Sequence, residues 1–238
     1  MTKSTIAARV ALLDWARITD DLDRRGTATT GVLLTPPECA ALATMYADDT
    51  AFRSHIIMAR HGFGKGEYKY FSRPLPGLIE GLRTSLYPQL APLANRWSEA
   101  MKLGVIYPPQ LDEFLARCHA AGQTRPTPLL LKYESGDYNC LHQDLYGDNV
   151  FPLQVAFLLS RPGIDFEGGE FVLVEQRPRM QSRPEVVPLL QGEGVIFAVR
   201  TRPVVGTKGT YRVNLRHGVS RIRAGQRFTT GIIFHDAT

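Results

Sequence analysis

The sequence predicts an α+β protein in which N-terminal helices buttress a double-stranded β-helix, a jelly-roll type of barrel. Apolar residues recur at helical spacing in the N-terminal part, whereas short β-rich runs separated by turn clusters follow Thr127. The length of 238 residues favours one domain over several. We therefore expect a single domain over residues 1–238, mainly helical over 1–126, with the barrel core over 127–238.

The first expected helix covers residues 4–25. Its apolar residues recur at roughly helical spacing with charges between them: Ile6, Val10, Leu13, Ala16 and Ile18. The segment from Gly26 to Gly31 should break this helix. A short strand is then expected over residues 31–35.

Thr35 and Glu38 have the spacing of a capping box, in which each residue satisfies a free backbone N–H of the other. Prolines directly after Thr35 favour the same helix start. The pattern therefore predicts a helix that begins after Thr35 and runs to about Tyr46.

Residues 74–100 form a longer amphipathic stretch, which Pro88 and Pro92 should interrupt because proline lacks the backbone N–H that a helix needs. Residues 109–121 are expected to form a further helix. These helices would buttress one sheet of the barrel.

Short β-rich runs make up the C-terminal half. They are expected at residues 129–133, 153–159, 170–175, 185–189, 194–199, 211–216 and 227–234. Turn clusters such as Glu-Ser-Gly-Asp at 134–137 and Glu-Gly-Gly at 167–169 separate them. The mouth of such a barrel is a natural place for a ligand.

The chain is mildly basic, with a formal net charge of +5 and a sequence pI near 9.2. Basic residues crowd the C-terminal quarter: Arg200, Arg202, Lys208, Arg212, Arg216, Arg221, Arg223 and Arg227. This clustering is compatible with a polyanionic partner, although solvated strand edges also collect arginine and lysine.

The three cysteines, Cys39, Cys118 and Cys140, are odd in number and widely spaced. This argues against a disulfide framework and favours a reducing compartment. Met1 to Leu13 has no secretory pattern, and no run of apolar residues reaches membrane-spanning length. We expect a cytoplasmic protein with no membrane partner.

The segment His142-Gln143-Asp144 is the strongest candidate for chemistry. In an extended chain alternate side chains share a face, so His142 and Asp144 should both point into the barrel. His217 would join them from a distant strand. Two imidazoles and one carboxylate on one face of an octahedron suit oxygen-activating Fe(II), since three positions stay open. We therefore predict that these three residues hold Fe(II).

Arg227 follows His217 by ten residues and is expected on the next strand. Its planar guanidinium suits a carboxylate, so Arg227 is predicted to bind the far carboxylate of 2-oxoglutarate, with Thr229 on the same strand face. A non-enzymatic alternative is a metal-free jelly roll that binds a sugar or another ligand, which would make this whole constellation a coincidence.

At these residues the sequence resembles the Fe(II)/2-oxoglutarate dioxygenase superfamily. The spacing from His217 to Arg227 is similar to that of prolyl-hydroxylase-like members. Further similar segments are Gly168-Gly169-Glu170-Phe171, Gly192 to Phe197, and the strand and helix of residues 30–42. The resemblance implies Fe(II), 2-oxoglutarate and O2 as the reacting partners.

The stretch from Tyr133 through Gly136 to His142 and Asp144 resembles the AlkB-type nucleic-acid dealkylases. By this resemblance Tyr133 contacts 2-oxoglutarate. The chain as a whole also resembles a bacterial group of AlkB-like nucleic-acid oxygenases. The resemblance implies oxidative demethylation of alkylated bases, single-stranded or damaged nucleic acid as the partner, and a role in DNA repair.

Residues 58–73 resemble the substrate lid of the same enzymes. The segment is rich in glycine, aromatic and basic residues, and its candidate substrate contacts are Arg60, Lys65, Tyr68 and Tyr70. Bases can stack on such rings while cations meet phosphates. The alternative is a twisted hairpin whose aromatic side chains pack on the barrel.

Other residues are candidates for supporting roles around the metal. Asn214 and Arg216 flank His217 and are expected to support it, and His235 ends the strand that begins at Arg227. Two positions depart from the AlkB pattern: Leu131 replaces a polar 2-oxoglutarate contact, and the paired C-terminal arginines are not in place. Hydroxylation of a protein side chain or a small molecule at the same iron site is the alternative function, and the similarity of the C-terminal spacing to prolyl hydroxylases favours it.

Overall fold

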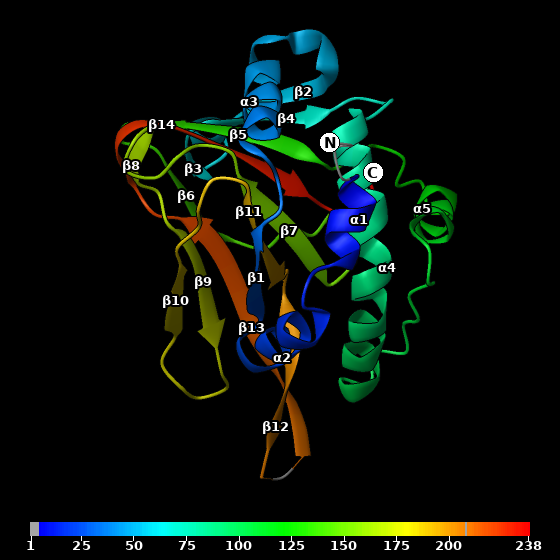
Figure 1. Ribbon diagram of the computed structural model, residues 1–238. Coiled ribbons are helices and arrows are strands. Elements are labelled where there is room, and N and C mark those ends of the chain that lie inside the picture. Colours follow the sequence, from blue (N-terminus) through cyan, green and yellow to red (C-terminus); the bar gives the residue numbers. More distant parts are fainter. Residues whose placement is uncertain (1–4, 208) are drawn as a thin grey trace.

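The computed structural model describes residues 5–207 and 209–238, so residue 4 of the expected first helix and Lys208 lie outside the described residues. Two antiparallel sheets face each other across the core, and helices lie along the outer side of the larger sheet (Figure 1). This arrangement confirms the expected α+β fold with a double-stranded β-helix.

The helices come mostly before the barrel strands. They are α1 (Ile6–Ala11), α2 (Trp15–Arg25), α3 (Pro36–Thr44), α4 (Gly77–Ala100) and α5 (Leu111–Ala120), with short 3-10 turns at Met45–Ala47, Asp49–Ala51 and Met58–Arg60. In Figure 1, α1 lies beside α4, and α5 lies on the far side of α4.

The larger sheet has the strand order β1-β11-β7-β14-β5-β4-β2, and β8 pairs with the N-terminal part of β14. Its members are β1 (Thr27–Val32), β2 (Phe52–Ile57), β4 (Glu67–Phe71), β5 (Leu129–Glu134), β7 (Leu153–Leu158), β8 (Phe166–Gly168), β11 (Glu193–Ala198) and β14 (Ile222–Ile232). The first 126 residues therefore contribute strands as well as helices.

The smaller sheet has the strand order β10-β9-β13-β6-β3, with β12 paired to β13. Its members are β3 (Gly64–Lys65), β6 (Tyr138–His142), β9 (Phe171–Gln176), β10 (Arg183–Val187), β12 (Thr201–Gly206) and β13 (Gly209–Val219). Burial alternates along β13, where Val213, Leu215 and His217 are buried and the residues between them are exposed. The smaller sheet thus turns one face to the core, as expected for an antiparallel sheet that is covered on one side only.

The expected helix over residues 4–25 is two helices in the described part of the chain. Thr5 accepts a hydrogen bond from the Ala8 N–H at the start of α1, and Asp14 accepts one from the Arg17 N–H at the start of α2. Asp14 is therefore an N-cap and not an interior helical residue, because its side chain competes for backbone N–H groups.

The first strand begins earlier than expected, at Thr27 instead of Gly31. Gly26 ends α2 with a φ of 77°, a conformation that glycine adopts without steric cost, and the chain then pairs at once with β11. The expected capping box is present, since the Glu38 carboxylate accepts hydrogen bonds from both the backbone N–H and the hydroxyl of Thr35.

Pro88 and Pro92 do not interrupt α4, which is continuous over 24 residues. The expected break is wrong because each proline removes only one backbone hydrogen bond, while a whole face of the helix is buried. This face includes Leu82, Leu86, Leu90, Leu93 and Trp97. Burial of several large side chains, each worth about 1.5–3 kcal/mol, outweighs two lost hydrogen bonds.

The lid-like segment over residues 58–73 lies largely within the barrel. β2 and β4 form an antiparallel hairpin, and β4 also pairs with β5 in the larger sheet. Tyr70 and Phe71 are buried there. The turn over residues 59–63 is exposed, whereas Met58 is buried. The interpretation as a hairpin with packed aromatic residues therefore describes β4 correctly.

None of the helices in the described ranges is long and apolar enough to cross a membrane. Cys39 and Cys118 are buried free thiols, and Cys140 is an exposed one.

Candidate active site

Strand pairing brings the two candidate histidines side by side. His142 at the end of β6 lies directly opposite His217 in β13, and their ring centroids are 4.2 Å apart. Asp144 follows β6. Its Oδ1 lies 3.5 Å from the Nε2 of His142, and its Oδ2 lies 3.3 Å from the Nε2 of His217.

The donor atoms of these three residues all lie within 4.8 Å of one another, so together they could hold one metal ion. Two imidazoles and one carboxylate are a donor set that suits Fe(II), with room for further ligands on the cavity side. The residues present therefore fit the metal expected from the sequence.

Burial and charge act in opposite directions on this cluster. Burial raises the pKa of Asp144, but hydrogen bonds and charge from His142 and His217 outweigh it and hold the pKa well below its usual range. Burial lowers the pKa of His217. Burial also lowers the pKa of His142, but the hydrogen bond and charge of Asp144 outweigh it and raise the pKa of that imidazole. A metal requires the ionised carboxylate and the neutral imidazoles, so its binding would displace the proton that His142 gains beside Asp144.

Two side chains that the sequence reasoning missed hold Asp144 in place. The Tyr146 hydroxyl donates to Oδ1 at 2.9 Å, and the Nε2 of Gln154 donates to Oδ2 at 2.7 Å. Tyr146 continues the alternation that places His142 and Asp144 on one face, and Gln154 is a buried polar residue within the apolar strand β7. The alternation that includes Tyr146 was visible in the sequence, whereas the contact of Gln154 with Asp144 depends on the fold.

Asn214 and Arg216 do not support His217. Both are exposed, because alternate residues of β13 point to opposite sides of the sheet and only the odd-numbered ones face the core. The His217 ring packs instead against Phe171, at a centroid distance of 6.0 Å, and against Phe197, at 4.5 Å. The expected supporting role of Asn214 and Arg216 is therefore corrected.

The residues expected at 2-oxoglutarate lie together next to the cluster. Arg227 lies opposite Tyr133 in the pairing of β14 with β5, and its guanidinium carbon is 5.6 Å from the Tyr133 ring centroid. An Nη of Arg227 donates to the Thr229 hydroxyl at 2.7 Å, while its buried Nε has no partner among the described residues.

Arg227 is 2% exposed, and its guanidinium forms no ion pair with a carboxylate in the described part of the chain. Burial lowers the pKa of Arg227 to about 10, which still leaves the guanidinium charged at neutral pH. A buried, charged and incompletely bonded guanidinium is costly unless an anion completes it. The arrangement suits a carboxylate ligand.

A cavity of about 230 Å³ joins these two groups of residues. Besides the cluster, Arg227, Thr229 and Tyr133, its wall is largely aromatic and aliphatic: Phe63, Tyr68, Leu129, Leu131, Leu145, Tyr146, Phe171, Leu189, Phe197 and Val219. Gln143, Gln154 and Asn139 supply polar groups. The cavity can take a flat apolar group next to the metal ligands.

The four candidate substrate residues separate into two pairs. Tyr68 lines the cavity, and Tyr70 is buried, with its hydroxyl donating to the Tyr146 hydroxyl at 3.0 Å. Arg60 is exposed on the turn that precedes β3, and Lys65 is exposed in β3 itself. Of the four, Tyr68 therefore shares the cavity with the metal-ligand cluster, and Tyr70 reaches the cluster through Tyr146.

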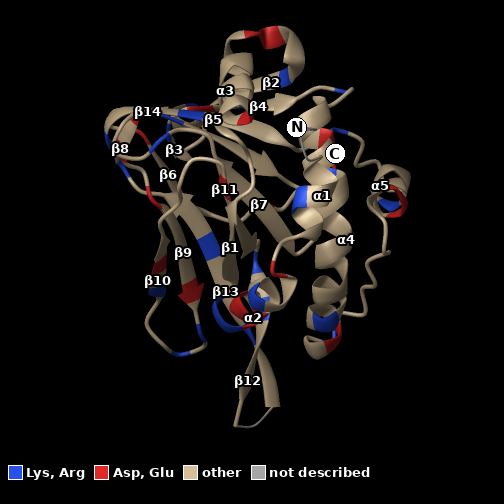
Figure 2. Ribbon diagram, in the orientation of Figure 1, with Lys and Arg blue, Asp and Glu red and all other residues tan. Residues whose placement is uncertain are grey.

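The basic C-terminal cluster does not form one surface. Arg202 and Arg227 are buried, and Arg202 forms an ion pair with the buried Glu175. The exposed members are Arg200, Arg212, Arg216, Arg221 and Arg223. In Figure 2, lysine and arginine are distributed over several elements. Lys208 lies outside the described residues.

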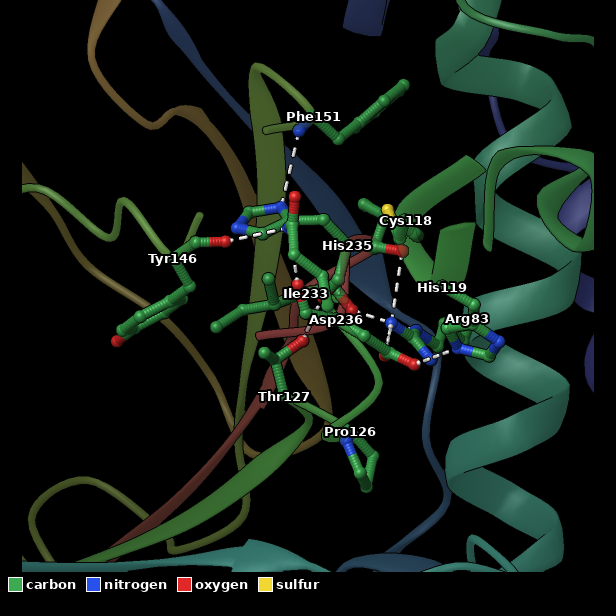
Figure 3. Close-up of polar contacts among 12 residues, drawn as sticks. Arg83, Cys118, His119, Pro126, Thr127, Tyr146, Phe151, Ile233, His235 and Asp236 are labelled. Atoms are coloured by element: carbon green, nitrogen blue, oxygen red, sulfur yellow. Dashed lines mark hydrogen bonds and ion pairs between the residues drawn. The ribbon is translucent and has the colours of Figure 1, made fainter. Parts of the chain in front are cut away.

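His235 lies in a buried polar cluster behind the cavity (Figure 3). Its Nδ1 accepts a hydrogen bond from the Phe151 N–H at 3.2 Å, and its ring centroid is 6.0 Å from that of Tyr146. Burial lowers the pKa of His235 to about 4, so the ring is neutral at pH 7. His235 thus contacts Tyr146 and none of the three candidate ligands.

A family model named Oxygenase-NA, described as an oxygenase that catalyses oxidative methylation of damaged DNA, matches residues 66–237. The chain belongs to the Oxygenase-NA family. Two proteins of Mycobacterium tuberculosis, MT2286 of strain CDC 1551 and Rv2227 of strain H37Rv, are each 53% identical to it over 167 residues, which are 70% of this chain and 72% of each relative. Both are described as uncharacterized.

This Oxygenase-NA protein shares its fold with solved 2-oxoglutarate-Fe(II) oxygenases. A prolyl-4-hydroxylase of Pseudomonas putida superposes with a TM-score of 0.53 at 14% identity, covering 94% of this chain and 99% of the other. A prolyl hydroxylase of Trichoplax adhaerens, solved with a hypoxia-inducible-factor peptide, gives 0.54 at 15%, covering 97% and 92%.

The family, the fold and the His-Asp-His cluster together identify a 2-oxoglutarate-dependent Fe(II) oxygenase. The predictions of an enzyme, of Fe(II) and of 2-oxoglutarate are therefore confirmed, and the metal-free sugar-binding interpretation is wrong.

Proposed function

We propose that this Oxygenase-NA protein removes methyl groups oxidatively from alkylated nucleic-acid bases, as a cytoplasmic DNA-repair enzyme. The observation that carries the proposal is the largely aromatic and aliphatic cavity that ends at His142, Asp144 and His217. The family description, which names damaged DNA, supports the same substrate class. A base extruded from its strand would enter this cavity with its methyl group directed at the metal ligands.

Each residue has a distinct part in this proposal. His142, Asp144 and His217 hold Fe(II), which with O2 and 2-oxoglutarate supplies the oxidising chemistry when bound. Arg227, Thr229 and Tyr133 hold and orient the far carboxylate of 2-oxoglutarate. The balanced reaction converts one N-methyl group, one O2 and one 2-oxoglutarate into N–H, formaldehyde, succinate and CO2.

Tyr68 lines the cavity together with Phe63 and offers an aromatic face on which an extruded base can stack. Arg60 on the turn before β3 and Lys65 in β3 are exposed, where they can meet backbone phosphates. The largely apolar wall of the cavity keeps water away from the reacting methyl group. Tyr70 lies behind Tyr68 and contacts Tyr146.

Incubation of a methylated single-stranded oligonucleotide with the protein, Fe(II), 2-oxoglutarate and ascorbate should remove the methyl group. Mass spectrometry of the oligonucleotide, with succinate quantified in the same tube, measures both products. The His142→Ala variant is the control and should show neither. Succinate formed while the methyl group stays intact would contradict demethylation and point to a protein side chain or a small molecule as the substrate of the same iron site.

Replacement of Arg227 with alanine should chiefly raise the 2-oxoglutarate concentration needed for half-maximal turnover, by about 10- to 100-fold, because a charged hydrogen bond to a carboxylate contributes about 1.5–3 kcal/mol. Succinate formation at varied 2-oxoglutarate measures the change. Arg227→Lys keeps the charge but loses the planar fork and should recover only part of the affinity. An unchanged requirement in Arg227→Ala would remove this residue from the 2-oxoglutarate site.

A further inference from the structure

A chain of hydrogen bonds leads from the β2–β4 hairpin to the carboxylate of Asp144. The Tyr70 hydroxyl donates to the Tyr146 hydroxyl at 3.0 Å, and the Tyr146 hydroxyl donates to Asp144 Oδ1 at 2.9 Å. Tyr70 is 8% exposed, so water competes little for the first of these bonds. Two phenols thus connect strand β4 with a residue on the loop after β6.

Each oxygen of the Asp144 carboxylate has the same arrangement of neighbours. Oδ1 accepts from Tyr146 and lies 3.5 Å from His142 Nε2, while Oδ2 accepts from Gln154 at 2.7 Å and lies 3.3 Å from His217 Nε2. The two outer donors fix the rotation of the carboxylate plane. Without them the carboxylate could turn away from the two imidazoles, because its final side-chain torsion is broad.

Tyr146 is itself held from behind. The Nε2 of Gln123 donates to the backbone carbonyl of Tyr146 at 2.8 Å and to that of Asp236 at 2.7 Å. Gly147 allows this contact, since a Cβ there would lie 2.5 Å from the Gln123 Cδ. Figure 3 shows Tyr146 next to His235 at the edge of the same polar cluster. The Tyr146 backbone is therefore anchored to the C-terminal segment behind the cavity.

We propose that Tyr146, held by Tyr70 and Gln123, is a positioning residue that orients the Asp144 carboxylate towards His142 and His217. The inference rests on the metal site proposed above, but it does not depend on the substrate. A residue that orients a metal ligand through a hydrogen bond typically contributes a factor of about 10 to 100 in metal affinity. Tyr70 acts one bond further away and should contribute less.

Titration calorimetry of the full chain with Mn(II), a redox-stable stand-in for Fe(II), tests the proposal. Tyr146→Phe should weaken Mn(II) binding about tenfold, and Tyr70→Phe about two- to threefold as the more distant member of the network. In the Tyr146→Phe background, Tyr70→Phe should have no further effect, because its hydroxyl then has no route to Asp144. This double-mutant cycle separates a hydrogen-bonded chain from independent packing effects.

Tyr87→Phe is the matched control, because it also removes a buried tyrosine hydroxyl that donates a hydrogen bond, here to the Pro108 carbonyl at 3.0 Å, outside the cavity. Its Mn(II) affinity should equal that of the unaltered protein. Suppose that Tyr146→Phe binds Mn(II) within twofold of the unaltered protein, while Asp144→Ala still loses binding. This result would overturn the positioning role of Tyr146 but not the metal site. If Asp144→Ala left the Mn(II) affinity unchanged, both the metal site and this inference would be overturned.

Discussion

Replacement of Asp144 with alanine is expected to reduce 2-oxoglutarate turnover by roughly a thousandfold or more, which corresponds to about 4 kcal/mol of lost transition-state stabilisation. Asp144 is the only carboxylate in the three-residue cluster, and its two oxygens face the two imidazoles at 3.5 and 3.3 Å. The remaining pair of histidines cannot complete the facial arrangement that Fe(II) needs. Succinate formation under saturating Fe(II) and 2-oxoglutarate measures the loss.

The variant should remain folded, because Asp144 lies at the cavity and the barrel core does not depend on it for packing. Thermal unfolding followed by circular dichroism checks this. Asp148→Ala is a matched control, since Asp148 is an exposed carboxylate four residues along the same loop and should leave turnover unchanged. His142→Ala and His217→Ala should behave like Asp144→Ala. A folded Asp144→Ala protein with more than about a tenth of normal turnover would contradict the metal assignment.

Replacement of Asp236 with alanine is expected to lower the free energy of unfolding by about 3–5 kcal/mol, because it leaves a buried guanidinium without its counter-charge. Asp236 is fully buried and binds Arg83 at 2.7 Å and His119 at 2.9 Å (Figure 3). It also binds Arg73 at 2.6 Å. Arg83 is also 0% exposed and donates to the carbonyls of Ile233 and Phe234. These bonds attach the C-terminal segment to α4 and α5.

Urea unfolding of the two proteins measures this difference. Asp20→Ala is the matched control: its partner Arg24 lies at 3.1 Å, but both side chains are more than half exposed, so the change should be much smaller. A loss below about 1 kcal/mol in Asp236→Ala would show that Arg83 finds other partners or water.

The Asp236 carboxylate should also make the free energy of unfolding depend on pH in the acidic range. Burial raises the pKa of Asp236, but Arg83, His119 and Arg73 outweigh it and hold the pKa below its ordinary value. A carboxyl with a depressed folded-state pKa stabilises the protein fully above its unfolded value, near 3.9, and loses this contribution as the pH falls through the folded value. Unfolding free energies measured from pH 6 down to about pH 3 should therefore converge for the unaltered protein and Asp236→Ala.

Much of the active-site prediction followed from local sequence. Alternation along an extended strand placed His142 and Asp144 on one face, and the same rule put Arg227 and Thr229 together on β14. Capping by Thr35 and Glu38, and most strands after Thr127, depend on neighbouring residues in the same way. Such features are readable because the interacting groups are only a few residues apart.

Features that depend on distant contacts were wrong or missed. Pro88 and Pro92 were expected to break α4, but burial of one helix face overrides local propensity. Asn214 and Arg216 were chosen for their closeness to His217 in sequence, whereas the alternation of side chains along β13 leaves both exposed to solvent. Gln154 lies ten residues from Asp144 in sequence, and only the fold brings their side chains into contact.

By itself the sequence determined the chemistry available to this protein: two imidazoles, a carboxylate and a guanidinium at spacings that suit Fe(II) and 2-oxoglutarate. The tertiary structure alone decided that β6 and β13 pair with His142 opposite His217, that Tyr70 and Tyr146 reach Asp144, and that Arg83 and Asp236 hold the C-terminus. The reason is physical. Residue types and short spacings fix which groups can react, whereas strand register and burial, which arise from many distant contacts, fix where those groups meet.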